Sequence, residues 1–190
     1  MPQKRLILAM TGASGQIYGI RLLQLLARTP EIETHLLLSQ AALITLAQET
    51  DFTPEQVQAL ADVVYSPDDI GAAIASGSFT TAGMIIAPCS IKTLSAIAHS
   101  YADNLIARAA DVQLKEGRPL LLMVRETPLH LGHLRLMTQA AELGAIIFPP
   151  APALYARPQS LEEMVTHTAG RMLARLGIAN DAYAEWQGLE

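Results

Sequence analysis

The sequence contains very little cysteine. Cys89 is the single cysteine among 190 residues, which excludes a disulfide framework within the chain and a zinc site built from several cysteines. A chain without disulfides suits a reducing compartment, and we therefore expect a cytoplasmic location. We interpret Cys89 as a small buried apolar residue, with a nucleophile as the less favoured alternative.

Positive charge and long apolar runs are also scarce. The 13 lysines and arginines are outnumbered by 18 acidic residues, for a net charge of −5, so electrostatic binding of nucleic acid is not expected. The apolar run after Lys4 and Arg5 ends at residue 10, whereas a signal peptide needs roughly seven or more apolar residues. The longest uncharged stretch, residues 70–91, is interrupted by Gly, Ser, Thr and Pro, which argues against a membrane span.

Short apolar runs alternate with segments of helical spacing along the whole chain. Hydrophobic residues make up 51% of it, and we expect residues 1–190 to form a single domain around one core. Apolar runs without charge are typical of parallel strands that are covered on both faces. The alternation therefore predicts an α/β protein, a three-layer sandwich with a mainly parallel sheet. The predicted strands are residues 6–10, 36–38, 84–87, 120–124 and 145–148, and helices are predicted at residues 54–63 and 161–176, among others.

Small, polar or turn-forming residues follow each predicted strand. Ligands of an open α/β sheet bind beyond the carboxyl ends of its strands. We therefore expect these turns to line one crevice, although they are far apart in the sequence. They are Thr11-Gly12-Ala13-Ser14-Gly15, Ser39, Pro88-Cys89-Ser90, Arg125-Glu126-Thr127-Pro128 and Pro149-Pro150.

The first of these turns leads directly into a helix. Gly12 and Gly15 allow a ligand to approach the backbone, and the helix N-terminus can offer N–H groups to an anion. The turn lacks the G-x-G-x-x-G pattern, and the second strand ends in Ser39 rather than in an acid for a ribose hydroxyl, which argues against NAD. A mononucleotide phosphate is the favoured ligand, and an ordinary tight turn between strand and helix is the alternative.

Two charged residues follow the fourth predicted strand. Burying Arg125 and Glu126 at a strand end is costly unless the charges are paired or used. They therefore suggest an anion-binding arginine beside an acid/base carboxyl group, with a surface salt bridge as an equally open alternative.

Other titratable residues give weaker signals. His130 and His133 have no third ligand in view, and Asp68-Asp69 has no second acidic cluster, so we predict no metal and interpret the histidines as capping or packing residues. His167, Arg171 and Arg175 are spaced four residues apart on the last helix. That spacing usually indicates a solvated face, although Arg171 could point at a phosphate.

A series of motifs resembles the UbiX family of flavin prenyltransferases over nearly the whole chain. Residues 126–142 are especially similar to members from the enterobacterial ubiquinone pathway. In chain order the motifs are Thr11-Gly12-Ala13-Ser14-Gly15, Glu49-Thr50-Asp51, Pro88-Cys89-Ser90, Arg108-Ala109-Ala110-Asp111-Val112, Leu114-Lys115-Glu116, Pro119-Leu120, Arg125-Glu126-Thr127-Pro128-Leu129, Pro158-Gln159-Ser160 and Trp186-Gln187-Gly188.

The resemblance implies a flavodoxin-like or Rossmann-like fold and a homo-oligomer, which is dodecameric in the family. It implies a reaction that joins dimethylallyl phosphate to reduced FMN at N5 and then at C6, without a metal. The product, prenylated FMN, would serve a partner decarboxylase of the UbiD type.

The resemblance also implies roles for individual residues. Glu126 would handle protons at the leaving phosphate and in the second bond-forming step, and Ser14, Glu49 and Trp186 would complete the catalytic pocket. Lys92 departs from the pattern, because some members carry glycine there. The implied FMN contacts are Gly12, Ala13, Ser14, Ser39, Ser90, Ile91, Lys92, Thr93 and Arg125, and the implied contacts to dimethylallyl phosphate are Lys115, Arg125, Tyr155 and Arg171.

Two rival functions remain open at this point. One is a flavin-dependent cysteine-type decarboxylase of the same superfamily, against which Lys115, Arg125 and Glu126 argue. The other is a flavin carrier subunit without catalytic activity, which would bind the cofactor but would not need the carboxyl group of Glu126.

Overall fold

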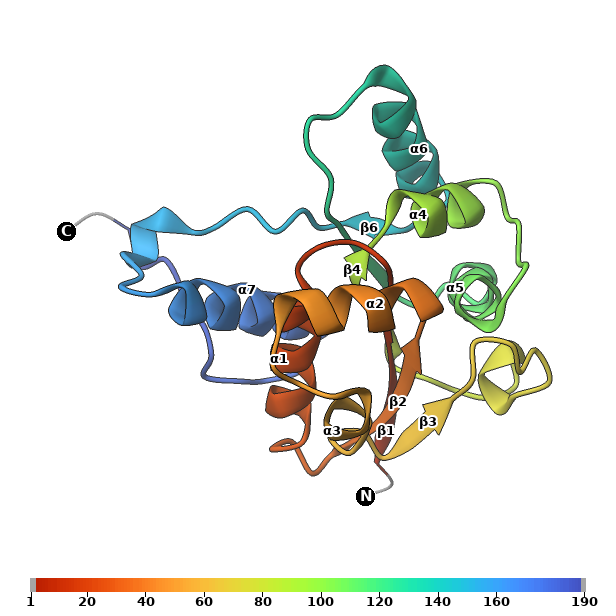
Figure 1. Cartoon of the computed structure of the whole chain (residues 1–190), viewed down its shortest axis with the longest axis horizontal. Coiled ribbons are helices and arrows are strands. Elements are labelled where there is room, and N and C mark those ends of the chain that lie inside the picture. The colour runs from red at the N-terminus through yellow and green to blue at the C-terminus, as the bar shows by residue number, and fades with distance from the viewer. Residues whose placement is uncertain (1–2, 189–190) are drawn as a thin grey trace.

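Six parallel strands form the sheet at the centre of the molecule (Figure 1). The computed structural model describes residues 3–188. The strand order is β3-β2-β1-β4-β5-β6, so the direction of winding reverses between β1 and β4. The strands are β1 (Lys4–Met10), β2 (Ile32–Leu38), β3 (Val63–Tyr65), β4 (Gly83–Cys89), β5 (Leu120–Val124) and β6 (Ile146–Ile147).

Helices cover both faces of the sheet. Helices α1, α2, α3 and α7 pack against one face, where α7 lies beside α1 (Figure 1). Helices α4, α5 and α6 pack against the opposite face. Two short 3-10 helices, η1 (Ala73–Ala75) and η2 (Leu154–Ala156), lie in connections. The α-helices are α1 (Gln16–Leu26), α2 (Gln40–Glu49), α3 (Pro54–Gln58) and α7 (Leu161–Arg175), and then α4 (Ile91–Ala98), α5 (Leu105–Lys115) and α6 (Leu131–Glu142).

The burial of β1 explains why its sequence is apolar without alternation. Leu6, Leu8 and Met10 belong to the core on one face, and Ile7 and Ala9 belong to the core on the other face. All five are fully buried, and each larger side chain contributes roughly 1.5–3 kcal/mol by leaving water. The prediction of a three-layer α/β sandwich with a parallel sheet is confirmed, and the arrangement is flavodoxin-like.

The least regular part of the sequence was predicted with errors. Thr53 caps α3 and forms a capping box with Gln56, but the helix ends at Gln58 rather than at residue 63. The chain then turns and adds the edge strand β3, where Val63 pairs with His35 of β2. This strand was not predicted, because three residues are too few to show a pattern. Within residues 3–188 there is no helix with the length and apolar character that crossing a membrane demands.

Candidate functional site

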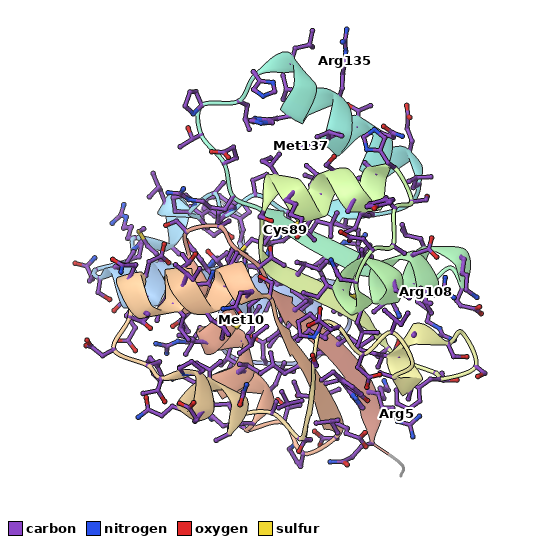
Figure 2. The ribbon with its side chains drawn as sticks, turned by 45° about the vertical axis from the view of Figure 1, so that its right-hand side comes forward. Arg5, Met10, Cys89, Arg108, Arg135 and Met137 are labelled. Carbon is purple, nitrogen blue, oxygen red and sulfur yellow. The ribbon has the colours of Figure 1, made fainter. Side chains whose placement is uncertain are left out.

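The carboxyl ends of four adjacent strands are linked by main-chain hydrogen bonds. The N–H of Ser39, after β2, donates to the carbonyl of Met10 in β1 at 3.1 Å. The N–H of Arg125, after β5, donates to the carbonyl of Cys89 in β4 at 3.3 Å. Figure 2 shows Met10 and Cys89 close to the middle of the molecule. The turns after β1, β2, β4 and β5 therefore lie at the same end of the sheet, whereas Pro149 of the fifth turn lines a cavity with residues of α7.

Thr11 joins the two strands on either side of the winding reversal. Its side chain is buried, and its Oγ1 donates to the carbonyl of Pro88 at 2.9 Å and accepts from the N–H of Ser90 at 2.8 Å. Its own N–H also donates to the carbonyl of Pro88, at 3.1 Å. The turns after β1 and β4 are therefore fixed to each other at the topological switch point, where open α/β sheets bind their ligands.

Two helices begin at this end of the sheet. Ser39 caps α2 by accepting from the N–H of Ala42 at 3.1 Å, and Ser90 caps α4 by accepting from the N–H of Thr93 at 3.3 Å. The first N–H groups of a helix have no partner within the helix, and they carry partial positive charge. One N–H group at each end, that of Ala42 or Thr93, is bonded to the capping serine, and the remaining N–H groups and the serine hydroxyls can donate to a phosphate-bearing ligand.

The N-terminus of α1 has a different role from the one expected. The carboxylate of Glu49 accepts from the N–H of Gly15 at 2.8 Å and from the N–H of Gln16 at 3.0 Å. Two of the N–H groups that were expected to face a ligand phosphate, those of Gly15 and Gln16, are therefore already bonded to a carboxylate from α2. Gly12 has no room for a side chain because the Cβ of Ala41 lies against it. The glycine thus allows α2, as well as any ligand, to approach the turn.

Glu49 and Ser14 are brought together, as the resemblance implied. Partial burial raises the pKa of Glu49. This rise is outweighed by hydrogen bonds from Ser14, Gly15 and Gln16 and by the nearby charge of Arg125, so the net shift of the pKa is downward. The carboxylate is consequently ionised near neutral pH. It orders the turn that carries Ser14.

Arg125 and Glu126 are exposed and directly follow β5, at the same end of the sheet. Burial raises the pKa of Tyr18 in α1, and the charge of Arg125 partly offsets that rise. The carboxylate of Glu126 accepts from the N–H of Thr127 at 2.9 Å. Arg125 makes no salt bridge with any carboxylate between residues 3 and 188, which leaves its guanidinium available to a ligand.

A cavity of about 300 Å³ lies between the segment after β6 and helix α7. It brings together two of the implied phosphate contacts, Tyr155 and Arg171. The ring of Trp186 lies 5.5 Å from that of Tyr155 at 74°, so the implied pocket residue is there too. The lining residues are Ile147, Phe148, Pro149, Ala151, Ala153, Tyr155, His167, Thr168 and Arg171.

Two residues of this region were missed or misread in the sequence. His167 was interpreted as part of a solvated face, yet it lines the cavity one helical turn before Arg171. Tyr183 lies 5.8 Å below the guanidinium of Arg171, in a cation–π arrangement. The four-residue spacing on α7 was the signal for His167, whereas the position of Tyr183 depends on how the chain folds back after the helix.

Lys115 is not brought to the crevice within one chain. It is the last residue of α5, which leads into the amino end of β5. It therefore lies at the amino ends of the strands, whereas Arg125 lies at their carboxyl ends. Its ammonium group contacts the carboxylate of Glu116 at 2.6 Å. Arg108, on the same helix, lies to the side of Met10 and Cys89 in Figure 2.

The start of α4 and the start of α6 face each other across a groove. Ile91 and Lys92 line it together with His130 and His133. His130 caps α6, because its Nδ1 accepts from the N–H of Gly132 at 2.9 Å, and its ring stacks on that of His133 at 3.6 Å. The interpretation of these histidines as capping and packing residues is confirmed. The part of the chain that the structure describes has no cluster of three residues able to hold a metal ion.

Cys89 is fully buried, as expected from the sequence. Burial raises the pKa of its thiol to about 12. The thiolate is therefore absent at neutral pH, and Cys89 is not a nucleophile.

A parallel sheet whose winding reverses between two central strands, with helix N-termini at the carboxyl ends of its strands, is typical of mononucleotide-binding α/β proteins. The Flavoprotein family model matches residues 1–170 of the chain. The flavin prenyltransferase UbiX of Escherichia coli strain K12 is 63% identical over 187 residues, covering 97% of this chain and 99% of the relative. The chain therefore belongs to the flavoprotein family and, within it, to the UbiX flavin prenyltransferases.

Solved structures agree with this assignment. The crystal structure of AnUbiX (PadA1) in complex with FMN and dimethylallyl pyrophosphate superposes with a TM-score of 0.95 at 45% identity, covering 99% of this chain and 100% of that one. A dodecameric FMN-dependent Ubix-like decarboxylase from Escherichia coli O157:H7 gives a TM-score of 0.94 at 46% identity, covering 97% and 100%.

Proposed function

We propose that the protein transfers the dimethylallyl group of dimethylallyl phosphate to reduced FMN, and that the prenylated FMN is passed to a UbiD-type decarboxylase. The observation that carries the proposal is the pairing of two serine-capped helix N-termini at the switch point with a cavity that contains Tyr155 and Arg171. The bound FMN and prenyl donor of the similar crystal structure support the pairing. The reaction takes place in the cytoplasm, in a single domain formed by residues 1–190.

The crevice at the strand ends holds the flavin. The N-termini of α2 and α4, with Ser39 and Ser90, bind its phosphate, because both helices begin at the carboxyl end of the sheet. Arg125 lies against the same ligand. When bound, reduced FMN supplies the nucleophilic N5 and C6 atoms. The remaining contacts come from Gly12, Ala13, Ser14, Ile91, Lys92 and Thr93.

The cavity beside α7 holds the donor. Phosphate is a poor leaving group unless its charge is held, and Arg125, Tyr155 and Arg171 supply cationic and hydrogen-bonding groups without a metal. Trp186 and the apolar wall exclude water from the developing allyl cation. Glu126 accepts the proton released from C6 when the second bond, between C6 and the allyl carbon, forms, and it delivers a proton to the departing phosphate.

Lys115 contributes to the site of a neighbouring subunit. Within its own chain Lys115 lies at the amino ends of the strands, away from Arg125, so only an assembly can bring it to a donor phosphate. The dodecameric relative supports such an assembly. Co-expressed Lys115→Ala and Glu126→Gln chains are expected to regain activity as a mixed oligomer. Some sites then combine the intact Glu126 of one chain with the intact Lys115 of its neighbour. A monomer with full activity would refute the proposal.

The role of Glu126 is tested by Glu126→Gln, with Glu142→Gln at the exposed end of α6 as the matched control. The reduced flavin and dimethylallyl phosphate are supplied anaerobically, and the flavin products and the FMN affinity are measured. Glu126→Gln is expected to bind FMN normally and to lose prenylation by about 10²–10³-fold, as is typical of a removed acid/base group, while Glu142→Gln stays active. Unchanged prenylation by Glu126→Gln would overturn this role and would favour a carrier.

A further inference from the structure

The cavity beside α7 has two chemically different walls. One wall is apolar and comes from β6 and the segment after it, including Ile147, Phe148 and Pro149. The other wall is polar and carries Tyr155, His167, Thr168 and Arg171. Ligand pockets usually combine an apolar lining with a few convergent polar groups. A small organic anion, apolar at one end and negatively charged at the other, matches both walls.

The side chain of His167 is held in place at the polar wall. Its ring meets the ring of Tyr155 at 6.0 Å and 81°, and the ring of Tyr183 at 6.1 Å and 89°. Two nearly perpendicular aromatic contacts restrict the orientation of an imidazole. Its Nε2 lies 3.4 Å from the carbonyl oxygen of Ala184, at the outer limit of a hydrogen bond. Nδ1 makes no hydrogen bond within residues 3–188, so one ring nitrogen remains for a ligand.

Packing alone does not account for a histidine at this position. A phenylalanine would make the same edge contacts with Tyr155 and Tyr183 without a polar atom. His167 also precedes Arg171 by four residues, which places both side chains on one face of α7. Both side chains can donate hydrogen bonds, and an anion can accept from both. Their common placement in the cavity fits a bound anion.

We propose that His167 is a further donor-binding residue, whose imidazole hydrogen-bonds the phosphate of the prenyl donor together with Tyr155 and Arg171. This inference rests on the proposed function, because it takes the cavity as the donor site. It adds a third phosphate contact on the polar wall. Since that contact is present before and during bond breaking, it affects donor affinity more than the chemical step.

The test compares His167→Phe, which keeps the aromatic contacts, with His167→Gln, which keeps a hydrogen-bond donor. His99→Phe is the matched control, because His99 is exposed at the end of α4, away from the cavity. His167→Phe is expected to raise the KM for dimethylallyl phosphate about tenfold, the effect of one hydrogen bond to a charged group. Its kcat and FMN affinity are expected to stay within twofold, and His167→Gln is expected to regain most of the loss.

Inorganic phosphate provides a second readout that does not depend on turnover. Its affinity for the FMN-loaded protein is measured by NMR titration, and His167→Phe is expected to weaken it by a similar factor. An unchanged KM or an unchanged phosphate affinity in a folded His167→Phe variant would overturn the inference. A wild-type protein that leaves the flavin unmodified would instead refute the proposed function, and the phosphate titration would still decide the role of His167.

Discussion

The hydrogen bonds of Thr11 offer a direct way to loosen the switch point without changing its shape. Thr11→Val replaces the hydroxyl by a methyl group of similar volume, so no cavity forms. It removes the bond from Oγ1 to the carbonyl of Pro88 and the bond from the N–H of Ser90 to Oγ1. The carbonyl of Pro88 still accepts from the main chain of residue 11. The N–H of Ser90 loses the partner that holds it.

The expected cost follows from this unequal loss. A buried N–H group left without an acceptor costs about 1–3 kcal/mol, so we expect the free energy of unfolding to fall by about 2 kcal/mol. For a chain of this length that corresponds to a decrease in Tm of roughly 4–8 °C. Ser90 caps α4 at the proposed phosphate site, and a shift of this turn is expected to weaken FMN binding about tenfold, which is about 1.4 kcal/mol.

Thr81→Val is the matched control. Thr81 is also buried, and its Oγ1 donates to Oε1 of Gln113 at 2.7 Å, near the amino end of β4 and away from the crevice. The control should also lower the Tm, because the buried Oε1 of Gln113 loses its hydrogen-bond donor. It should leave the FMN affinity unchanged. Thermal melts and fluorescence titration with FMN measure both quantities. Equal FMN affinities for the two variants would refute the view that Thr11 organises the binding site.

Three further outcomes are expected. Cys89 should resist alkylation by iodoacetamide in the folded protein at pH 8, since its thiol has a pKa of about 12, whereas rapid modification of native protein would contradict its burial. Burial lowers the pKa of His35, with Glu33 opposing the shift, so the unfolding free energy should be fully retained above about pH 6.5 and fall as the pH decreases below it. His35→Gln should flatten that part of the denaturation profile, and an unchanged slope would exclude His35 as its source. Glu49→Gln should destabilise the protein by about 1 kcal/mol at pH 7, a modest value for an exposed group. Its native pKa lies below the unfolded value, so this difference should disappear as the pH falls below about 4.5, and a difference that persists at pH 3 would point to another cause.

The fold could be predicted from the sequence wherever a strand is buried on both faces. Residues 6–10 and 120–124 show this clearly, because helices on both sides of the sheet require every position to be apolar. The edge strand β3 could not be predicted in this way. Val64 is exposed there, and a three-residue strand at a sheet edge shows neither a continuous apolar run nor an alternation.

The site could be predicted only in part. Its turns were found because the carboxyl ends of parallel strands must share one edge. The partner of the α1 N-terminus was not found, because Glu49 lies 34 residues from Gly15 and only the fold brings the two together. The position of His167 in the cavity could not be predicted either, because helical spacing alone does not distinguish a solvated face from the wall of a cavity.

Mass measurement of the flavin tests the central claim most directly. The wild-type protein is incubated anaerobically with reduced FMN and dimethylallyl phosphate. The flavin is then released, and its molecular mass is measured by mass spectrometry. We predict that it gains one C5H8 unit and that inorganic phosphate is released in equal amount. Recovery of unmodified FMN with intact dimethylallyl phosphate, from folded protein that binds both, would contradict the account.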